Sequence, residues 1–237
     1  MIIDLHSHIL PGFDDGARTP EESVAMLNRI AAEGIALVVA TPHYYFYNES
    51  PEQFLARRDA AFQTLAPYLK PHHPHILLGA EVLYSRALQD PEVLSRFKIQ
   101  GTDYLLLEMP YEKLTDKLIA GVGDIAERAG AKIIIAHVER YLSFTDARSI
   151  DALMNQYVLG QANTKSLSGK ARKPLLKLME KGFIHVLGTD FHRIESGQWL
   201  IREAREVLDK KFSPDFFDRM MYNAQLVLEN KDMDEIL

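Results

Sequence analysis

The feature that most constrains this chain is the regular alternation of short apolar runs with longer segments that have the pattern of amphipathic helices. Seven runs rich in β-branched and aliphatic residues recur, at 1–6, 35–43, 75–82, 104–109, 132–139, 157–163 and 184–192. Such apolar runs are typical of strands that are buried on both faces, and strands separated by helices pair in parallel. The sequence therefore predicts an α/β fold with helices packed on a parallel sheet.

The segments between these runs carry helix signals, at 19–34, 50–69, 114–130, 146–156, 169–182 and 196–211. In the first segment Thr19 is placed to cap a helix, Pro20 needs no N–H in the first turn, Glu22 is placed to complete a capping box, and Gly34 is a stop signal. Seven strand–helix units favour a closed or nearly closed barrel over an open doubly wound sheet. The segment 213–231 predicts an extra amphipathic C-terminal helix that packs on the outside.

The composition narrows the classes of partner and of chemistry. The chain carries 27 Lys+Arg against 33 Asp+Glu, a net charge of −6, which argues against nucleic acid as a partner. No apolar run approaches the roughly 20 residues of a membrane helix and no leader is recognisable, so a cytoplasmic location is expected. The absence of cysteine excludes disulfides, thiolate nucleophiles and thiolate metal ligands. Without a linker or a composition break, we expect one domain over 1–237.

Histidines and carboxylates recur where the apolar runs end. His6 and His8 are two residues apart, so their side chains point to the same face of a strand. Similar residues close the other runs, namely His43, Glu81, Glu108, His137, Asp190 and His192. One such residue alone is more often a satisfied core histidine or a capping carboxylate, but so many buried charges together need partners. Because the C-terminal ends of parallel strands meet at one edge, the sequence predicts a multinuclear metal site there.

The types of ligand indicate the metal and the reaction. Nitrogen combined with carboxylate oxygen suits Mn²⁺, Fe²⁺ or Zn²⁺ better than Ca²⁺ or Mg²⁺. Glu81 and Glu108 are expected to bridge metal ions. Either Asp14 or Asp15, in the turn after the first run, is expected to add an oxygen; the alternative is a solvent-facing turn before Gly16. Such a cluster activates water and binds phosphate oxygens, so phosphoester hydrolysis is the expected reaction.

Other residues near the run ends are expected to support the site. Asp4 shares the parity of the first two histidines but lies deeper, so a structural role is expected. Gln161 and Asn163 end the sixth run, and their amides are expected to orient substrate or neighbouring carboxylates. The aromatic segment 44–47 either stacks on a substrate ring or packs its loop against the barrel. The histidine-rich segment 71–75 is expected to be a solvated loop away from the site.

Taken together, the motifs resemble those of a known family. The resemblance rests on DLHSHILPGFDDGARTPEES, VVATPHYY, GAEV, LLEMP, IAHVERY and GTDFH, which cover almost the whole chain. These motifs resemble the polymerase-and-histidinol-phosphatase (PHP) superfamily and, within it, the bacterial manganese-dependent protein-tyrosine phosphatases of capsule and exopolysaccharide synthesis. The resemblance implies a distorted, TIM-like (β/α)₇ barrel. It also implies three metal ions, with Mn²⁺ as the favoured metal and Fe²⁺, Zn²⁺ or Co²⁺ as the alternatives. The implied reaction is hydrolysis of phosphotyrosine by a metal-bound hydroxide, without a covalent phosphoenzyme.

The resemblance also assigns roles to individual residues. It implies a first metal held by His6, His8, Glu81 and Asp190, a second by Glu81, Glu108 and His137, and a third by Asp15, His43 and His192. Arg140 resembles the family's phosphate-binding arginine, which would neutralise charge on the transferred group. The alternative is a surface arginine paired with Glu139 or Asp146.

The remaining substrate contacts match the family less completely. Family members usually carry a second arginine a few residues after the D-x-H motif, where this chain has Gly197. Arg193, directly after the motif, is a candidate for that role, although its side chain starts from a different point. Tyr44 and Tyr45 in the aromatic segment are the other candidate substrate contacts.

The implied partner is a phosphotyrosine protein, specifically a bacterial tyrosine autokinase that is dephosphorylated on its tyrosine-rich tail. A small-molecule phosphatase, such as a histidinol-phosphate phosphatase, is the alternative within the same chemistry, because metal ligands do not select the leaving group. The missing second arginine suggests a different class of function, a binding module that captures a phosphorylated ligand without hydrolysing it. Nucleic-acid hydrolysis is disfavoured by the acidic charge balance.

Overall fold

The strands of the sheet are short and lie within the predicted apolar runs. The structure is a computed structural model of the chain, and it describes residues 1–86, 88, 90–194 and 201–237. The strands are β1 (Ile2–Ser7), β2 (Ile35–Ala40), β3 (His43–Tyr44), β4 (His75–Leu78), β5 (Glu81–Leu83), β6 (Tyr104–Glu108), β7 (Lys132–Ile135), β8 (Leu159–Asn163) and β9 (Val186–Gly188). The predicted α/β class is confirmed.

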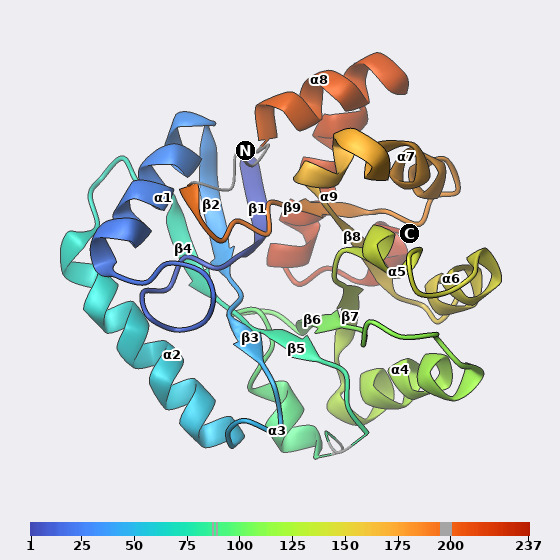
Figure 1. Ribbon diagram of the computed structural model, residues 1–237, viewed down its shortest axis with the longest axis horizontal. Helices are drawn as coiled ribbons and strands as arrows, with labels where there is room; N and C mark the ends of the chain where they lie inside the picture. The colour runs from blue at the N-terminus through green and yellow to red at the C-terminus, as the bar shows by residue number, and fades with distance from the viewer. Residues whose placement is uncertain (87, 89, 195–200) are drawn as a thin grey trace.

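The strands form a curled parallel sheet in two sections. One section has the order β1-β2-β4 and the other the order β3-β5-β6-β7-β8-β9, and every pairing between them is parallel. The runs 35–44 and 75–83 each contribute one strand to each section, because the chain breaks its strand pairing at 41–42 and 79–80. At the other seam β1 lies beside β9, and an isolated parallel bridge joins Ser7 to Phe191, three residues after the end of β9. Figure 1 shows the strands curling around the centre of the molecule.

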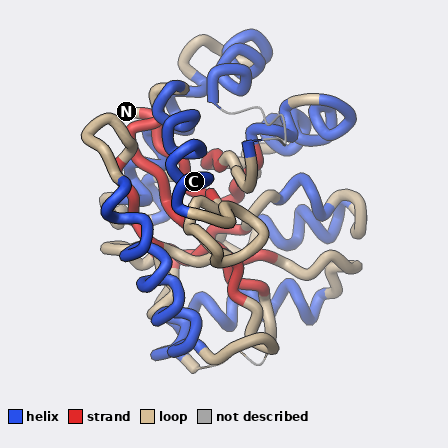
Figure 2. Tube along the Cα trace, turned by 60° about the vertical axis from the view of Figure 1, so that its left-hand side comes forward, coloured by secondary structure: helices blue, strands red, loops and turns tan. Residues whose placement is uncertain are grey.

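Helices surround this curled sheet (Figures 1 and 2). They are α1 (Pro20–Ala32), α2 (Pro51–Leu65), α3 (Pro91–Ser95), α4 (Asp116–Ala129), α5 (Val138–Tyr141), α6 (Ala147–Met154), α7 (Arg172–Glu180), α8 (Ile201–Lys211) and α9 (Phe216–Leu228), with 3₁₀ turns η1 (Ala66–Tyr68), η2 (Thr164–Leu167), η3 (Gly169–Ala171) and η5 (Met233–Glu235). The predicted helix 196–211 is described from residue 201 onward, and its first residues lie outside the described part. None of the described helices is long and apolar enough to cross a membrane.

The start of α1 differs in one detail from its predicted capping box. The Thr19 hydroxyl accepts a hydrogen bond from the backbone N–H of Glu22, as predicted. The Glu22 carboxylate, however, accepts from the backbone N–H of Arg18 at 2.9 Å and pairs with the Arg18 guanidinium. A charged donor one residue earlier therefore replaces the N-cap N–H as the partner of Glu22.

The predicted loop at 71–75 ends one residue early, since His75 opens β4. Its other two histidines, His72 and His73, each place a ring nitrogen about 3 Å from the side-chain oxygen of Asn28. This loop lies at the start of β4, and the site described below lies at the C-terminal edge of the sheet.

Two apolar cores lie on the two faces of the sheet. One lies between strands and helices and includes Val38 and Leu105, whereas the other is enclosed by the strands and includes Val39 and Leu106. Consecutive side chains of a strand belong to different cores, so each of these strands is buried on both faces.

The prediction that the C-terminal helix only packs outside was wrong in part. Leu226 of α9 and Ile236 beyond it belong to the core enclosed by the strands. The Tyr104 hydroxyl, at the start of β6, donates to the carbonyl of Lys231 at 2.8 Å. The end of α9 and the following tail therefore close the N-terminal opening of the curled sheet.

Truncating Leu226 tests this closure. We expect Leu226→Ala to lower the free energy of unfolding by about 2–4 kcal/mol, since the side chain is 4% exposed and its removal leaves a cavity. The measurement is urea unfolding followed by circular dichroism. Tyr222→Ala in the same helix, at a position that is 59% exposed, is the control and should change stability by less than about 0.5 kcal/mol. Equal losses in the two variants would contradict the enclosed position of Leu226.

Candidate metal centre

The inward-facing positions of the strands change from apolar to polar as each strand reaches its C-terminal edge. In β6 the enclosed Leu106 is followed two residues later by Glu108. In β8 the enclosed Leu159 is followed by Gln161 and Asn163 on the same face. The same strand faces that line the apolar interior thus place a layer of polar side chains above it.

An extra residue in β1 brings His6 to this layer. Asp4 pairs with Val38 of β2 and Ser7 pairs with Ala40, so β1 has one more residue than β2 between these two pairs. Such a bulge shifts the alternation by one residue, and Leu5 faces the apolar interior while His6 faces the site. Strict alternation of side chains from the start of the strand does not predict that these two neighbours both lie on the inner side of the sheet.

One group of four buried ligand types gathers around the end of β1. Its members are His6, His8, Glu81 and Asp190, whose ligand atoms all lie within 4.8 Å of one another. The Nε2 atom of His6 is 3.2 Å from Glu81 Oε2 and 3.5 Å from Asp190 Oδ1, and Nε2 of His8 is 3.4 and 3.3 Å from the same two oxygens. These four are the residues predicted to hold the first metal.

A second group shares Glu81 with the first. His43, Glu81 and Glu108 lie within 4.8 Å of one another, and His43 Nδ1 is 2.9 Å from Glu81 Oε2. The ring of His137 approaches the same carboxylates, with Nε2 2.7 Å from Glu81 Oε1 and 3.6 Å from Glu108 Oε1. Glu81 therefore lies at the centre of both groups, in the position that a bridging ligand would need.

A third group lies nearer to solvent. It consists of His8, Asp15, His43 and His192, again with ligand atoms within 4.8 Å. Asp15 Oδ1 is 3.3 Å from His192 Nε2 and 3.7 Å from His43 Nε2, and the Asp15 side chain is 68% exposed. The three residues predicted for the third metal are thus together, with His8 as an additional neighbour.

The structure separates the roles of the two adjacent aspartates. Asp14 Oδ2 is 2.8 Å from His8 Nδ1, and the carboxylate also accepts hydrogen bonds from the backbone N–H groups of Gly16 and His43. Asp14 therefore orients the ring of His8, while Asp15 faces the cluster. Gly16 permits this tight turn, because a Cβ atom there would lie 2.1 Å from the carbonyl oxygen of His8.

The charges of the cluster shift its pKa values in opposite directions. Burial lowers the pKa of His8, but Asp14, Asp190 and Glu81 outweigh burial and hold that pKa well above its ordinary value. Burial raises the pKa of Glu81, but the surrounding histidines outweigh it and hold that pKa well below the ordinary value. Burial together with the charge of Glu81 raises the pKa of Glu108 to about 7. Protons on histidine and Glu108 thus balance buried charge that cations can balance instead.

Two ligand atoms in the described structure are buried without a hydrogen bond. These atoms are Nδ1 of His43 and Oε2 of Glu81. Although His43 Nδ1 and Glu81 Oε2 are close, they are not aligned as donor and acceptor. Buried polar atoms without partners are costly, and metal coordination satisfies them. The mixed imidazole and carboxylate set therefore fits divalent transition-metal ions.

Two amides behind the cluster hold its ligands in place. The side-chain oxygen of Gln161 accepts from the backbone N–H of His137 at 2.8 Å and lies 3.2 Å from His6 Nδ1. Asn163 donates to Asp190 Oδ2 at 2.7 Å and accepts from Gln161. These contacts orient ligand side chains, in line with one of the two roles considered for the amides.

Asp4 lies below the ligands and supports the turn that carries Asp190. Its carboxylate accepts from the backbone N–H and the hydroxyl of Thr189 and from the backbone N–H of His6. Burial raises the pKa of Asp4 to about 6 despite these hydrogen bonds. Asp4 joins β1 to β9 and lies outside the three ligand groups, as its predicted structural role requires.

Two predicted ligands have left-handed backbone conformations. The φ angles of His137 and Asp190 are 31° and 50°. Residues other than glycine rarely adopt positive φ, and such positions concentrate at functional sites. At both positions the chain leaves a strand and turns, so the side chain points across the sheet edge into the cluster.

The guanidinium of Arg140 lies at the rim of the cluster. Its Nη2 group pairs with Asp190 Oδ2, and Nη1 donates to the Tyr111 hydroxyl at 3.1 Å. Neither carboxylate of the surface alternative is its ion-pair partner. Glu139 is buried and accepts from the backbone N–H of Asn163, and Asp146 caps α6. Arg140 is 41% exposed in its side chain and so has both a fixed position and access to a ligand.

A pocket of about 840 Å³ opens over the cluster, and sequence reasoning identified only part of its lining. It is lined by Asp15, His43, Tyr45, Glu108, Tyr111, Arg140, Asn163, Lys165, Ser166, Ser168, Lys170, Ala171, Asp190, His192 and Arg193. Tyr111 and the segment 165–171 were missed. The signal that could have found them is their place in the loops that follow β6 and β8.

Of the candidate substrate contacts, Tyr45 and Arg193 lie at the pocket and Tyr44 does not. The Arg193 side chain donates to the carbonyl of Asp15 at 3.1 Å. Tyr44 is 1% exposed and stacks on Phe97 with ring centroids 4.3 Å apart, so the prediction that it contacts substrate was wrong. Adjacent residues of β3 point to opposite faces, which sends His43 to the site and Tyr44 into the core.

The packing interpretation of the aromatic segment 44–47 holds for Tyr44, while stacking on a substrate ring stays a prediction for Tyr45. Tyr44 packs inside, while the ring of Tyr45 stacks on His43 at 5.2 Å and on Tyr47 at 5.7 Å between centroids. Gly197, the position of the family's missing arginine, lies outside the described residues.

The chain is similar in sequence to known proteins along most of its length. The model of a family described as capsular polysaccharide synthesis, CpsB/CapC, matches residues 2–229. The chain is 30% identical to the tyrosine-protein phosphatase YwqE of Bacillus subtilis, over 97% of this chain and 92% of that protein. It is 26% identical to the tyrosine-protein phosphatase CpsB of Streptococcus pneumoniae, over 89% and 91%.

The fold is also similar to a solved structure. A structure from work on YwqE of Bacillus subtilis and CpsB of Streptococcus pneumoniae, described there as unique metal-dependent tyrosine phosphatases, superposes with a TM-score of 0.83. The match has 26% identity and covers 98% of this chain and 96% of the other.

Metal binding should displace protons from this cluster. Since Glu108 has a pKa of about 7 and the His6 and His8 pKa values are raised, a bound cation competes with protons below neutral pH. We expect the affinity for Mn²⁺ to be about tenfold higher at pH 8 than at pH 6. Isothermal titration calorimetry of the metal-stripped protein at both pH values measures this.

The control for this titration is the exposed Glu112, outside the ligand groups. Glu112→Gln should keep the pH dependence, whereas Glu108→Gln should weaken both binding and its pH dependence. Equal affinity at pH 6 and pH 8 in the unaltered protein would contradict the charge balance described above.

Proposed function

The chain belongs to the capsular polysaccharide synthesis family CpsB/CapC, and from this membership we propose that it is a metal-dependent protein-tyrosine phosphatase. The relatives carry that activity in their names, and they align along nearly their whole length. The chain has no cysteine, so the phosphate cannot pass to a thiolate. The observation that carries the proposal is the buried cluster of imidazoles and carboxylates centred on Glu81 beneath an open pocket.

We propose that the nine predicted ligands hold three cations, with Mn²⁺ as the native metal. The three groups overlap at Glu81, His8 and His43, which supports ions held close together. The assignment is a first ion on His6, His8, Glu81 and Asp190, a second on Glu81, Glu108 and His137, and a third on Asp15, His43 and His192. When bound, such ions activate water as the nucleophile and neutralise the charge of the phosphate oxygens.

The protein's own residues bind and orient the phosphotyrosine. The permanent positive charge of Arg140 lies beside Asp190 and Tyr111 at the pocket, where it can pair with phosphate oxygens. Tyr45, fixed by stacking on His43, offers a ring face to the tyrosyl group. Arg193 lines the same pocket, where its side chain donates to the Asp15 carbonyl, and supplies further positive charge.

The size of the pocket bears on the class of substrate. A pocket of about 840 Å³ with lining from the ends of β3, β6 and β8 and from the segments after β1, β3, β6, β7, β8 and β9 accommodates an aromatic phosphate still attached to its chain. This favours a phosphotyrosine protein over histidinol phosphate. We propose a bacterial tyrosine autokinase as that protein, on the basis of the resemblance noted above.

Two finer features of the fold belong to the same proposal. The bridge from Ser7 to Phe191, with the backbone N–H of His8 donating to the Phe191 carbonyl at 3.0 Å, supports closure of the curled sheet into a distorted (β/α)₇ barrel. The core enclosed by the strands draws residues from β1 through to the C-terminal tail, which supports one domain over 1–237.

The function is tested by phosphate release from a phosphotyrosine peptide and from histidinol phosphate, side by side. The metal-stripped protein, reloaded with Mn²⁺, should prefer the peptide, and its bound metal should approach three ions per chain by mass spectrometry. Preference for histidinol phosphate would replace the proposed substrate class. Binding of the peptide without phosphate release would indicate a capture module instead.

Substitutions at the cluster and at its rim should differ in severity. His6→Ala and Asp190→Ala each remove a proposed ligand, and we expect them to lower phosphate release by several orders of magnitude. Arg140→Ala should lower kcat/KM by about 10²-fold, because it removes charge that stabilises the transferred group. The exposed Arg148 of α6 is the control, and Arg148→Ala should stay within twofold. A loss below twofold in Arg140→Ala would remove that arginine from the mechanism.

A further inference from the structure

One segment of this acidic protein carries a concentrated positive charge. Residues 165–181 contain six Lys or Arg against one Asp or Glu, while the rest of the chain contains 21 against 32. The segment forms η2, η3 and α7, and it follows β8 directly after the amides that orient the metal ligands. The positively charged segment therefore begins beside the metal-ligand cluster.

Most of these cations have no acidic partner within the described structure. We define the α7 basic surface as Lys165, Lys170, Arg172, Lys173 and Lys177, all of them exposed. No carboxylate of the described residues lies within ion-pair distance of any of the five, whereas the neighbouring Lys181 pairs with Asp151 at 2.6 Å. The surface thus presents charge that no ion pair with the described residues neutralises.

The α7 basic surface is continuous with the pocket over the cluster. Lys165 and Lys170 line that pocket together with Arg140. Arg172, Lys173 and Lys177 line the next hollow along α7. In Figure 1, α7 lies beside α5, the helix that carries Arg140. The positive charge at the pocket is thus followed along the chain by the positive charge of α7.

A small apolar hollow borders the α7 basic surface at Lys173 and Lys177. It has a volume of about 260 Å³ and is lined by Leu142, Ala147, Lys173, Pro174, Lys177, Leu178 and Lys181. Lysines around an apolar floor suit a peptide whose acidic residues flank an apolar side chain.

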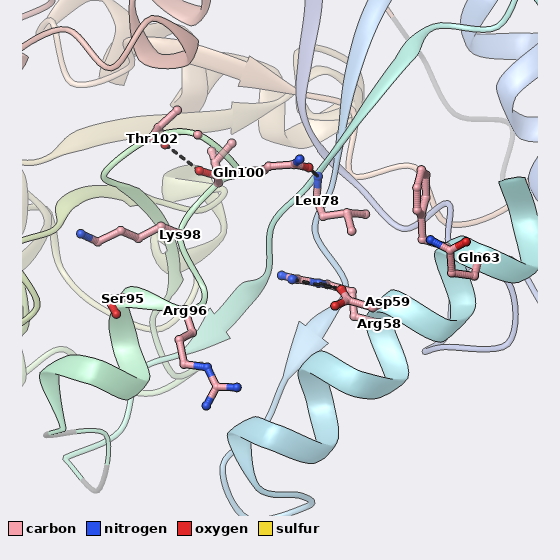
Figure 3. Close-up of a pocket in the computed structure, with 12 residues that line it drawn as sticks. Arg58, Asp59, Gln63, Leu78, Ser95, Arg96, Lys98, Gln100 and Thr102 are labelled. Carbon is pink, nitrogen blue, oxygen red and sulfur yellow. Dashed lines mark hydrogen bonds and ion pairs between the residues drawn. The ribbon is translucent and has the colours of Figure 1, made fainter.

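A second basic pocket, shown in Figure 3, differs in that its cations are already paired. It lies between α2 and the segment 95–102. Arg58 pairs with Asp59, which lies alongside it in Figure 3, Arg96 pairs with Glu52 at 2.7 Å, and Lys98 pairs with Asp103 at 3.0 Å. That pocket offers an anion far less uncompensated charge than α7 does.

We propose that the α7 basic surface binds the acidic residues that flank the target phosphotyrosine, so that the enzyme selects phosphotyrosine in an acidic peptide. This inference rests on the proposed phosphatase function and adds a substrate class to it. A protein substrate is favoured over a lipid surface because α7 exposes no large apolar side chain to insert into a membrane. The α7 basic surface lies outside the group of metal ligands, so its charge complementarity acts on substrate binding and therefore on KM.

The test compares three substrates of the metal-loaded enzyme: free phosphotyrosine, a phosphotyrosine peptide with Asp and Glu on both sides, and the same peptide with Asn and Gln. We expect kcat/KM for the acidic peptide to exceed that for the neutral peptide by about tenfold, mostly through KM, and the preference to fall with added salt. The variant R172E/K173E/K177E should lose the preference yet hydrolyse free phosphotyrosine within twofold of the unaltered enzyme.

The matched control is K70E/K117E/K210E, which makes the same change in net charge at three exposed lysines on other parts of the chain. It should keep the preference for the acidic peptide. Equal kcat/KM for the two peptides, or a preference that survives in R172E/K173E/K177E, would overturn the inference while leaving the phosphatase intact. Binding to anionic vesicles that this variant abolishes, without any peptide preference, would reassign the surface to a membrane. No phosphate release from free phosphotyrosine would overturn the proposed function itself.

Discussion

The structure depends on a negative charge buried at the centre of the strand ends. Glu81 is fully buried, and its two oxygens lie within 3.4 Å of nitrogens from His6, His8, His43 and His137. A carboxylate without compensation at this depth would be prohibitively costly, so the strands must bring positive charge to it from several directions. The strand breaks at 41–42 and 79–80 serve this purpose, since His43 and Glu81 each follow one of them.

Much of this arrangement could be predicted from the sequence because the chemistry repeats at the strand ends. His43, Glu108, His137 and Asp190 each close an apolar run, and parallel strands necessarily bring such ends to one edge. The donor types then limit the metals, and the absence of cysteine limits the nucleophile. The placement of Asp15 beside His192, by contrast, came from resemblance to a family, since the turn itself allowed either aspartate.

The differences from the sequence pattern have one local cause and two long-range causes. Tyr44 was placed at the site because it adjoins His43, yet strand alternation turns it into the core against Phe97. The bulge in β1 and the insertion of Leu226 and Ile236 into the enclosed core depend on partners far along the chain. The pattern of a single amphipathic helix, whose apolar face suits any core, does not reveal such partners.

The seam between β1 and β9 has a consequence for how the protein is made. Asp4 and Thr189 are hydrogen-bonded although 185 positions separate them, and Asp190 binds back to the His6 carbonyl beside them. On the ribosome the first histidines emerge long before the strand that completes their surroundings, and such distant contacts form late. Until β9 arrives, the nascent chain carries exposed imidazoles and carboxylates without the geometry to select among cations. Metal selection is therefore a property that the finished chain acquires in the last stage of its folding.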